Sequence, residues 1–268
     1  ENLNIFKIIK RFLCLLSKSL NKSFFIKHFI LILNLFKKFL DRIISMKVML
    51  WGAGGNSKIF LKMLEENFSG NFEVTGIFEN SLDSIPFKTE LPIFKTQKEL
   101  YNLIKVSTHF IISIGGNGLA RYQVSKKLKS LKLKPLNLIS KYSVLDDLDK
   151  YGEGIYAMPG AIVHKFTEIG DQCIFNTNST VDHDCILGNG VHVMGGAAIS
   201  GKVKIGDFSS IGTNATILPN ISIGKNCFIG AGAVVTKDVL NNQVVYGVPA
   251  RLMKMHTLSA DLDIFDNL

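Results

Sequence analysis

The chain has 268 residues and a formal net charge of +9, and this charge is unevenly distributed. Residues 1–45 hold nine Lys or Arg against Glu1 and Asp41, which gives +7 and leaves only +2 for the rest. The body of the protein therefore lacks the basic stripe that nucleic-acid binding requires. A length of 268 residues is enough for two domains with appended segments.

Residues 1–45 mix Phe, Leu and Ile with Lys and Arg, and we expect them to form a basic apolar leader. The longest uncharged run has about nine residues, which is too short to cross a bilayer. Such a segment suits contact with an anionic membrane surface. The alternative is that the native protein starts at Met46, because Met46 leads directly into a strand. No small-residue cleavage site follows the apolar run, which argues against a signal peptide.

Residues 46–140 are predicted to form a Rossmann-like α/β domain. The apolar strand 47–51 ends in the turn Gly52-Ala-Gly-Gly-Asn-Ser57, and a helical pattern follows. This arrangement is typical of phosphate binding, because glycines let the backbone approach a phosphate and the helix N-terminus offers free N–H groups. The alternative is an ordinary strand–helix turn in which glycine only permits a tight reversal.

Two further strands support the nucleotide-binding interpretation. Strand 73–78 ends at Glu79, about where an acidic residue would bind a ribose, and strand 109–114 ends at Gly115-Gly-Asn-Gly118. All three motifs follow strand C-termini, the edge at which open parallel sheets bind ligands. The domain has roughly half the length of a full dinucleotide-binding fold, which favours a mononucleotide or nucleotide sugar over NAD.

From residue 169 to residue 234 the sequence repeats every six residues. Each hexad opens with a large apolar residue, and its fifth residue is nearly always small or β-branched. The opening residues are Ile169, Phe175, Val181, Leu187, Val193, Ile199, Ile205, Ile211, Ile217, Ile223 and Ile229. A period of six predicts a parallel β-helix in which three hexads form one triangular turn. The phase extends back through Val163 and Ala157, so we place the β-helix at residues 141–235.

Small residues are expected at the corners of this β-helix. Gly follows the opening residue in six hexads, and we expect these glycines and the small fifth residues to let the chain turn. Cys173, Cys185 and Cys227 occupy the fifth position. They are predicted to be buried packing thiols, not disulfides or metal ligands, and they suit a reducing compartment.

Residues 236–268 are predicted to form a C-terminal tail, because the hexad phase is lost after Val235. The segment 247–251 has the composition of a terminating turn. Arg251 and Lys254 lie near the end of the coil, where they would meet CoA phosphates or remain solvated. Residues 255–268 are expected to form a short helix or a frayed end.

The segment Val181-Asp-His-Asp-Cys185 carries the most informative polar residues. His183 is the third residue of its hexad, where a side chain can face outward. An imidazole is a natural general base near neutral pH, and Asp184 or Asp182 beside it would fix its tautomer. The alternative is a surface histidine between two solvated carboxylates. His192 lies half a turn away, so a site using both histidines would form between subunits of a cyclic oligomer.

Residues 46 to about 254 resemble the bacterial sialic-acid O-acetyltransferases and nucleotide-amino-sugar N-acetyltransferases, which are left-handed β-helix enzymes. The resemblance also rests on the order of a Rossmann-like domain followed by hexapeptide coils. The residues that carry it are Gly52–Gly55, Ile114-Gly115, Asn176-Thr177, Val181–Cys185, Val191–Val193 and the exit Val245-Tyr-Gly-Val-Pro-Ala-Arg251. The implied fold is an α/β Rossmann-like domain followed by an all-β left-handed parallel β-helix.

This resemblance implies a cytoplasmic, homotrimeric sugar acetyltransferase that uses acetyl-CoA as co-substrate. It implies that His183 is the general base in direct transfer and that Asp184 raises the basicity of His183. The implied contacts to acetyl-CoA are His192, Thr213 and Ala231. The implied contacts to the nucleotide-linked or free sugar are Gly54, Gly55, Asn56, Glu79, Asn80 and Gly115.

Two positions depart from the family pattern and leave the acceptor open. Relatives commonly carry His in place of Asn56, and two Asp in place of Glu79-Asn80. The sugar, the nucleotide and the choice between N- and O-acetylation therefore stay undetermined. Two other functions compete with acetyl transfer. One is a non-catalytic nucleotide-sugar-binding protein, and the other is a zinc-dependent carbonic-anhydrase-like β-helix.

The zinc alternative would need three histidines to converge. Its only plausible ligands in the sequence are His164, His183 and His192. These residues occupy the second, third and sixth places of their hexads, and three-histidine zinc geometry is demanding. No metal site is therefore predicted.

Overall fold

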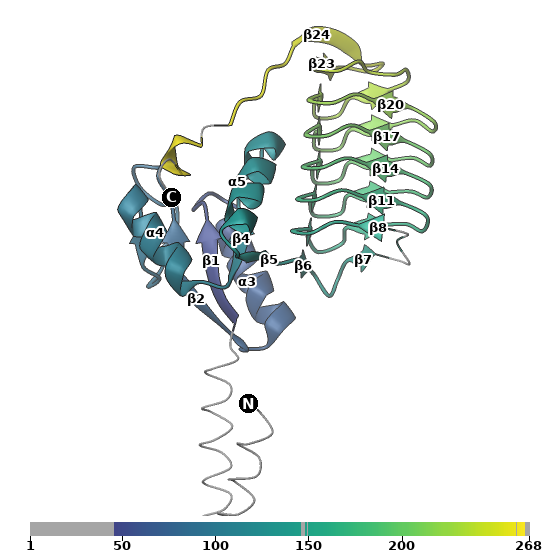
Figure 1. Cartoon of the computed structure of the whole chain (residues 1–268). Coiled ribbons are helices and arrows are strands. Elements are labelled where there is room, and N and C mark those ends of the chain that lie inside the picture. The colour runs from purple at the N-terminus through teal and green to yellow at the C-terminus, as the bar shows by residue number, and fades with distance from the viewer. Residues whose placement is uncertain (1–45, 146–147, 149, 261, 266–268) are drawn as a thin grey trace, which may run out of the picture. The chain divides into compact units, whose positions relative to one another are not determined.

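The computed structural model in Figure 1 describes residues 46–145, 148, 150–260 and 262–265. The predicted basic leader of residues 1–45 lies outside the described residues. The expectations of membrane contact and of a native start at Met46 concern this leader, so they also lie outside the described residues. Within the described ranges, no helix combines the length and the apolar character that crossing a membrane would need.

The first domain is a sheet of five parallel strands, in the order β3-β2-β1-β4-β5, with helices on both faces. The strands are β1 (Met46–Trp51), β2 (Phe72–Phe78), β3 (Ile93–Phe94), β4 (His109–Ile112) and β5 (Lys134–Pro135). The helices are α3 (Ser57–Phe68), α4 (Gln97–Val106) and α5 (Gly118–Ser130). The strand order reverses between β1 and β4. The C-terminal ends of these two strands are therefore the point at which such sheets bind ligands.

The two faces of this sheet are covered by different parts of the chain. Helix α3 packs its apolar side, including Phe60 and Leu64, on one face together with Tyr156 of the following coil. Helices α4 and α5 cover the opposite face. Helix α4 begins at a capping box, in which Thr96 and Glu99 satisfy each other's backbone N–H groups.

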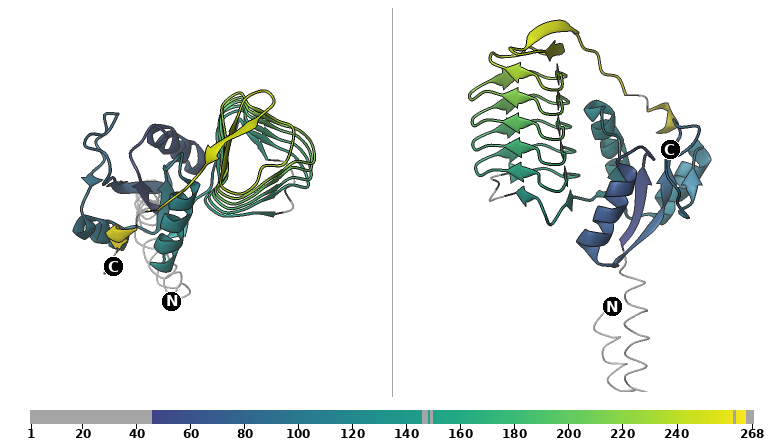
Figure 2. Two further views of the ribbon diagram at one scale, coloured as in Figure 1. Left: turned by 90° about the horizontal axis from the view of Figure 1, so that it is seen from above. Right: turned by 180° about the vertical axis from the view of Figure 1, so that it is seen from behind.

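From Leu138 onward the chain forms a parallel β-helix with three faces, starting three residues before the expected boundary (Figure 2). From β6 to β19, each two-residue strand pairs in parallel with the strand eighteen residues later, as Thr180 does with Ala198. One face packs against the first domain and is called the covered face. It comprises β6 (Leu138–Ile139), β9 (Tyr156–Ala157), β12 (Ile174–Phe175), β15 (His192–Val193), β18 (Ser210–Ile211), β21 (Phe228–Ile229) and β23 (Gln243–Tyr246).

The other two faces differ in the charge of their outward residues. The uncharged face comprises β7 (Val144–Leu145), β10 (Ile162–Val163), β13 (Thr180–Val181), β16 (Ala198–Ile199), β19 (Thr216–Ile217) and β22 (Val234–Val235). The charged face comprises β8 (Lys150–Tyr151), β11 (Glu168–Ile169), β14 (Ile186–Leu187), β17 (Lys204–Ile205) and β20 (Ser222–Ile223). The covered face packs against the first domain through residues such as Tyr156 and Ile174.

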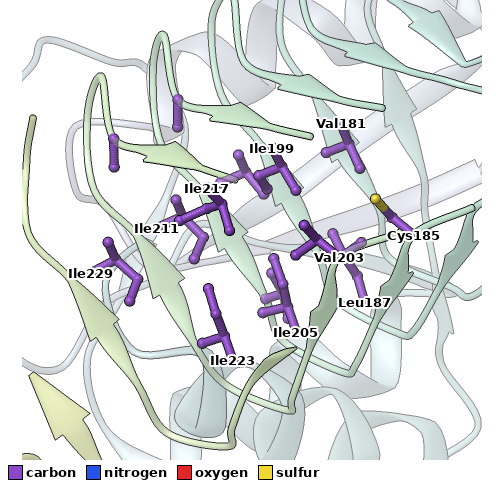
Figure 3. Packing of buried hydrophobic residues seen from close by; sticks show 14 of the residues in the cluster. Val181, Cys185, Leu187, Ile199, Val203, Ile205, Ile211, Ile217, Ile223 and Ile229 are labelled. Atoms are coloured by element: carbon purple, nitrogen blue, oxygen red, sulfur yellow. The ribbon is translucent and has the colours of Figure 1, made fainter. Parts of the chain in front are cut away.

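The core of the β-helix is built as the hexad pattern predicts. The opening residues and the fifth residues from Ile169 to Ala233 are all buried. In Figure 3 they point into the coil, where Ile205 stacks between Leu187 and Ile223. Each buried aliphatic side chain contributes about 1.5–3 kcal/mol, so the stack is the main source of stability. The three cysteines in this region are free and buried, and burial raises the pKa of Cys173 to about 12.

The corners, however, are not turned by the residues that we expected. The fourth residue of each hexad adopts a left-handed backbone, as at Asn178, Asp184 and Asn214. Asn and Asp tolerate this conformation better than most residues. The glycines after the opening residues do not adopt it. A Cβ on Gly170 would lie 2.7 Å from the backbone nitrogen of Asn189, so these glycines permit close stacking of successive turns.

The C-terminal tail returns from the coil to the first domain. Strand β24 (Arg251–Met255) pairs antiparallel with β23, and the His256 N–H then donates to the Asn242 carbonyl at 2.6 Å. The Asn117 side chain donates to the Ser259 carbonyl at 2.7 Å. A short helical turn (Asp263–Phe265) follows, and the Phe265 ring stacks on Trp51 at 5.0 Å. The predicted short helix is present, but it is docked instead of frayed.

Replacing Phe265 by Ala is expected to release this tail. Phe→Ala at a buried site costs roughly 3–5 kcal/mol, and Phe265 is the buried aromatic residue of this short segment. Trp51 is the only tryptophan of the chain, so its fluorescence should shift to the red as its ring meets water. Met253→Ala, at a side chain that is 62% exposed, should leave the spectrum unchanged. An unshifted spectrum of the Phe265 variant would show that this stack does not hold the tail.

Candidate active site

His183 lies at an open corner of the β-helix, between β13 of the uncharged face and β14 of the charged face. Its Nδ1 atom lies 2.7 Å from Oδ2 of Asp184, and the two side chains are 48% and 46% exposed. Asp184 is the left-handed corner residue, with a φ of 58°. The corner conformation thus places the carboxylate next to the imidazole. The Oδ1 atom of Asp182 instead accepts the backbone N–H of His183 at 2.8 Å.

The contact with Asp184 determines which nitrogen of His183 is basic. An ionised carboxylate can only accept hydrogen bonds, so Nδ1 must carry the shared proton. In the neutral imidazole this leaves the lone pair on Nε2, which faces away from Asp184. A neutral histidine held in this tautomer can take a proton from an acceptor group.

Gly201, which the sequence analysis missed, makes room for this imidazole. It lies one full turn after His183, and a Cβ at Gly201 would lie 2.9 Å from Nε2. Any larger residue would therefore crowd the basic nitrogen. The eighteen-residue period was the available signal, because residues one turn apart are neighbours on the same corner.

The three loops at the C-terminal edge of the first sheet are brought together as expected. The Ser57 hydroxyl lies 2.8 Å from the Ser113 hydroxyl, which joins the Gly-rich turn to the loop after β4. A Cβ on Gly115 would lie 3.2 Å from the Asn56 amide nitrogen. Gly54 and Gly55 face open space. Four of the predicted sugar-nucleotide contacts are thus neighbours at the switch point of the sheet.

Glu79 is placed at the same edge, but its carboxylate already has partners. Its Oε2 accepts the Ala53 N–H at 2.7 Å, and its Oε1 accepts the Ser81 hydroxyl and backbone N–H groups of Ser81 and Leu82. Burial raises the pKa of Glu79, but these hydrogen bonds outweigh it and lower the pKa overall. Glu79 therefore fixes the shape of the Gly-rich turn. The adjacent Asn80 is exposed.

His192 is buried against the first domain of its own chain, with only 5% of its surface exposed. Burial and the positive charge of Arg121 lower the pKa of His192 to about 3, so its ring is neutral. The backbone of Gly115 lies beside the ring and partly opposes this shift. Neither ring nitrogen has a hydrogen-bond partner of standard geometry within the described residues. His192 thus adjoins the loop after β4, which holds Gly115, and not the corner that carries His183.

Thr213 and Ala231, the other two implied acetyl-CoA contacts, are exposed residues on a different corner from His183. They stack one turn apart where the covered face meets the uncharged face, after β18 and β21. His183 lies at the opposite border of the uncharged face. The three residues therefore do not form one site within a single chain.

The histidines of the zinc hypothesis do not converge either. His192 is buried on the covered face, whereas His164 and His183 lie on the exposed surface. Among the residues that the structure describes, no cluster of three or more His, Cys, Asp or Glu side chains could hold a metal ion. The site geometry thus rests on the His183–Asp184 pair and on the loops of the first domain.

Comparisons with known proteins agree with the fold described above. Residues 202–237 match the family described as bacterial transferase hexapeptide (six repeats). The structure is similar to a histidine-to-asparagine mutant of perosamine N-acetyltransferase from Caulobacter crescentus, in complex with CoA and GDP-perosamine. The two share 26% sequence identity and a TM-score of 0.69, over 78% of this chain and 97% of the other. No curated protein matches the chain.

Two further solved structures share the same architecture. One is the acetyltransferase domain of PglB from Neisseria gonorrhoeae in complex with acetyl coenzyme A, with 28% identity. The other is WeeI from Acinetobacter baumannii, with 27% identity. Both have a TM-score of 0.69 and are covered over 100% of their length by 78% of this chain. The chain is therefore an acyltransferase with hexapeptide repeats, and it shares the Rossmann-like domain and left-handed β-helix of these sugar acetyltransferases, as its sequence predicted.

Proposed function

We propose that this protein transfers the acetyl group of acetyl-CoA to the amino group of a nucleotide-linked amino sugar. The observation that carries the proposal is the His183–Asp184 pair, at 2.7 Å, on a β-helix whose solved neighbours hold CoA or acetyl-CoA. An amine is favoured over a hydroxyl because the perosamine enzyme among these neighbours is named as an N-acetyltransferase and contains GDP-perosamine.

The reaction needs one base and two aligned substrates. The sugar amine attacks the thioester carbonyl carbon of acetyl-CoA, and Nε2 of His183 takes the proton that the amine loses. The C–N bond forms, the C–S bond breaks, and the CoA sulfur leaves with a proton returned from the imidazolium. Asp184 stabilises the imidazolium formed between these steps. Alignment of amine and thioester supplies up to roughly 7–11 kcal/mol of the acceleration, and the base adds ~10²–10⁴-fold.

The sugar nucleotide is assigned to the C-terminal edge of the first sheet. Gly54 and Gly55 leave open space in front of the helix α3 N-terminus, where backbone N–H groups suit a diphosphate. Asn56 and Gly115 border the same space, and exposed Asn80 lies at the end of β2. We assign these residues to nucleotide-sugar contact. Glu79 would act in this site by holding the Gly-rich turn.

We propose a homotrimer that assembles through the uncharged face. The outward residues of this face are apolar or small and carry no charge, unlike those of the charged face. They are Val144, Ile162, Thr180, Ala198, Thr216 and Val234. A continuous surface of this kind marks a protein interface.

The trimer would also complete the site. His183 lies at one border of the uncharged face, and Thr213 and Ala231 lie at the other. If this face points toward a threefold axis, the His183 border of one copy meets the Thr213 border of the next. Acetyl-CoA held at Thr213 and Ala231 would then present its thioester to His183 of a neighbouring copy. His192 is buried too deeply in its own chain to take part in the same way.

We place the protein in the cytoplasm, where acetyl-CoA and nucleotide sugars are made. The three cysteines of the β-helix are free thiols, which is usual for a reducing compartment.

An acceptor screen tests this function. The purified protein is incubated with acetyl-CoA and either GDP-, UDP- or dTDP-linked amino sugars, or free and CMP-linked sialic acids. Release of the CoA thiol and the mass gain of one acetyl group on the acceptor are followed together. We expect amino-sugar nucleotides to be acetylated on nitrogen. Acetylation of sialic acids alone would make the protein an O-acetyltransferase, and nucleotide-sugar binding without thiol release would make it a non-catalytic binding protein.

A further inference from the structure

Arg121 is a charged residue with no part in the chemistry described so far, yet it is completely buried. It lies on helix α5, and its side chain has 0% exposed surface. Burial lowers its pKa to about 10, so the guanidinium remains charged at neutral pH. A buried charge is costly unless it is paired or fully hydrogen-bonded. The burial of the Arg121 charge at this position therefore needs a physical explanation.

The partners of Arg121 are backbone carbonyls from two different parts of the chain. Its Nη1 donates to the carbonyls of Ile114 and Gly115, at 2.8 and 3.0 Å, in the loop after β4. Its Nε donates to the Gln172 carbonyl at 2.8 Å, and its Nη2 donates to the Gly190 carbonyl at 2.9 Å. Gln172 and Gly190 are one turn apart on the β-helix. The planar guanidinium thus joins two successive turns of the coil to one loop of the first domain.

The contact around Arg121 leaves little room for adjustment. Gly118 of helix α5 meets Gly190 so closely that a Cβ on Gly118 would lie 2.1 Å from the Gly190 carbonyl oxygen. Two helical turns after Gly118, the Ser125 hydroxyl accepts a hydrogen bond from the Gln172 side-chain amide at 3.0 Å. These close contacts therefore fix the position of the Gly115 loop relative to the β-helix.

We propose that Arg121 is a positioning residue that holds the nucleotide-sugar loop in register with the β-helix. The inference rests on the proposed function, in which Gly115 contacts the sugar nucleotide. The reacting amine must meet a thioester held on the coil, and the acceptor is held on the first domain. Arg121 fixes the distance between these two parts. Only Arg offers a rigid planar fork with five N–H donors, so Lys cannot replace it.

Steady-state kinetics of Arg121→Lys, at saturating acetyl-CoA and then at saturating nucleotide sugar, tests the proposal. We expect the KM for the nucleotide sugar to rise ~10-fold or more, because a displacement of about 1 Å has effects of this size or larger. The KM for acetyl-CoA should stay within about twofold, because its contacts lie on corners of the coil that Arg121 does not touch. A residue that merely stabilised the fold would lower the melting temperature and leave both KM values unchanged.

Two further variants complete the test. Gly118→Ala keeps Arg121 but forces helix α5 away from Gly190, and it should give the same split between the two KM values. Ser125→Ala removes a hydrogen bond from the same contact without moving the loop, and both KM values should stay at the wild-type level. Wild-type KM values in both the Arg121 and Gly118 variants would overturn the proposal. Absence of transfer by the wild-type protein would instead refute the proposed function.

Discussion

Replacing His183 by Ala is expected to lower kcat for acetyl transfer by ~10²–10⁴-fold, the contribution of a well-placed general base. The side chain is half exposed and supports no part of the core, so the melting temperature should stay near that of the wild type. The measurement is the rate of CoA thiol release with saturating acceptor. A variant that keeps wild-type turnover would remove His183 from the mechanism.

Two variants show whether the effect belongs to the His183–Asp184 pair. His109→Ala changes a histidine at the start of β4, the sheet edge opposite the nucleotide loops, and should leave kcat unchanged. Asp184→Asn keeps the size of the side chain but can donate to Nδ1 and so stabilise the wrong tautomer. We expect Asp184→Asn to lose a large part of the turnover that His183→Ala loses. Equal rates for Asp184→Asn and the wild type would make Asp184 a solvated neighbour.

Replacing Ile162 by Glu is expected to dissociate the trimer and abolish most of the activity with it. Ile162 is an outward residue of the uncharged face and is 40% exposed in the single chain. A carboxylate there would be buried without a partner in the assembly, which is strongly unfavourable. Because the site would need residues from two copies, kcat should fall at least ~10²-fold in the monomer. Light scattering with size-exclusion chromatography gives the mass, and the thiol assay gives the rate.

Ile186→Glu is the matched control for this experiment. Ile186 occupies the equivalent outward position of strand β14 and is 44% exposed, but it lies on the charged face. The same substitution there should leave both the mass and the rate unchanged. Dissociation by both variants, or a monomer that works at the wild-type rate, would contradict assembly through the uncharged face.

The β-helix was predictable in detail because its core is a local pattern repeated many times. Every opening residue faces the same core, so Ile205 or Ile217 can be assigned to the interior from its place in the hexad alone. The corners were less predictable. Residues with a left-handed backbone, such as Asn178 and Lys202, occupy the fourth position of the hexad. The residue types at this position are too varied to reveal the left-handed conformation. The glycines that drew attention, such as Gly170, serve the stacking of neighbouring turns, which only the structure shows.

The sequence named the individual residues of the candidate site, but it did not predict which other parts of the chain contact each of them. His183 and Asp184 are adjacent in sequence, so their contact follows from the local conformation of the corner. Glu79 satisfies its carboxylate with donors from residues 53, 81 and 82, which no single motif contains. His192 is buried by the first domain, although the family resemblance implied that it contacts acetyl-CoA.

The amino-acid sequence by itself determined the N-terminal α/β region and the three-sided β-helix, because each depends on a pattern within one strand–turn–helix unit or one period. That His183 and Asp184 form the catalytic pair stays a prediction. The tertiary structure alone decided how the two domains meet. That contact depends on Arg121, whose acceptors lie six to sixty-nine residues away, and a buried arginine has no signature in a single sequence. The contact could not be predicted because the carbonyls of two coil turns and one loop converge only after both domains have folded.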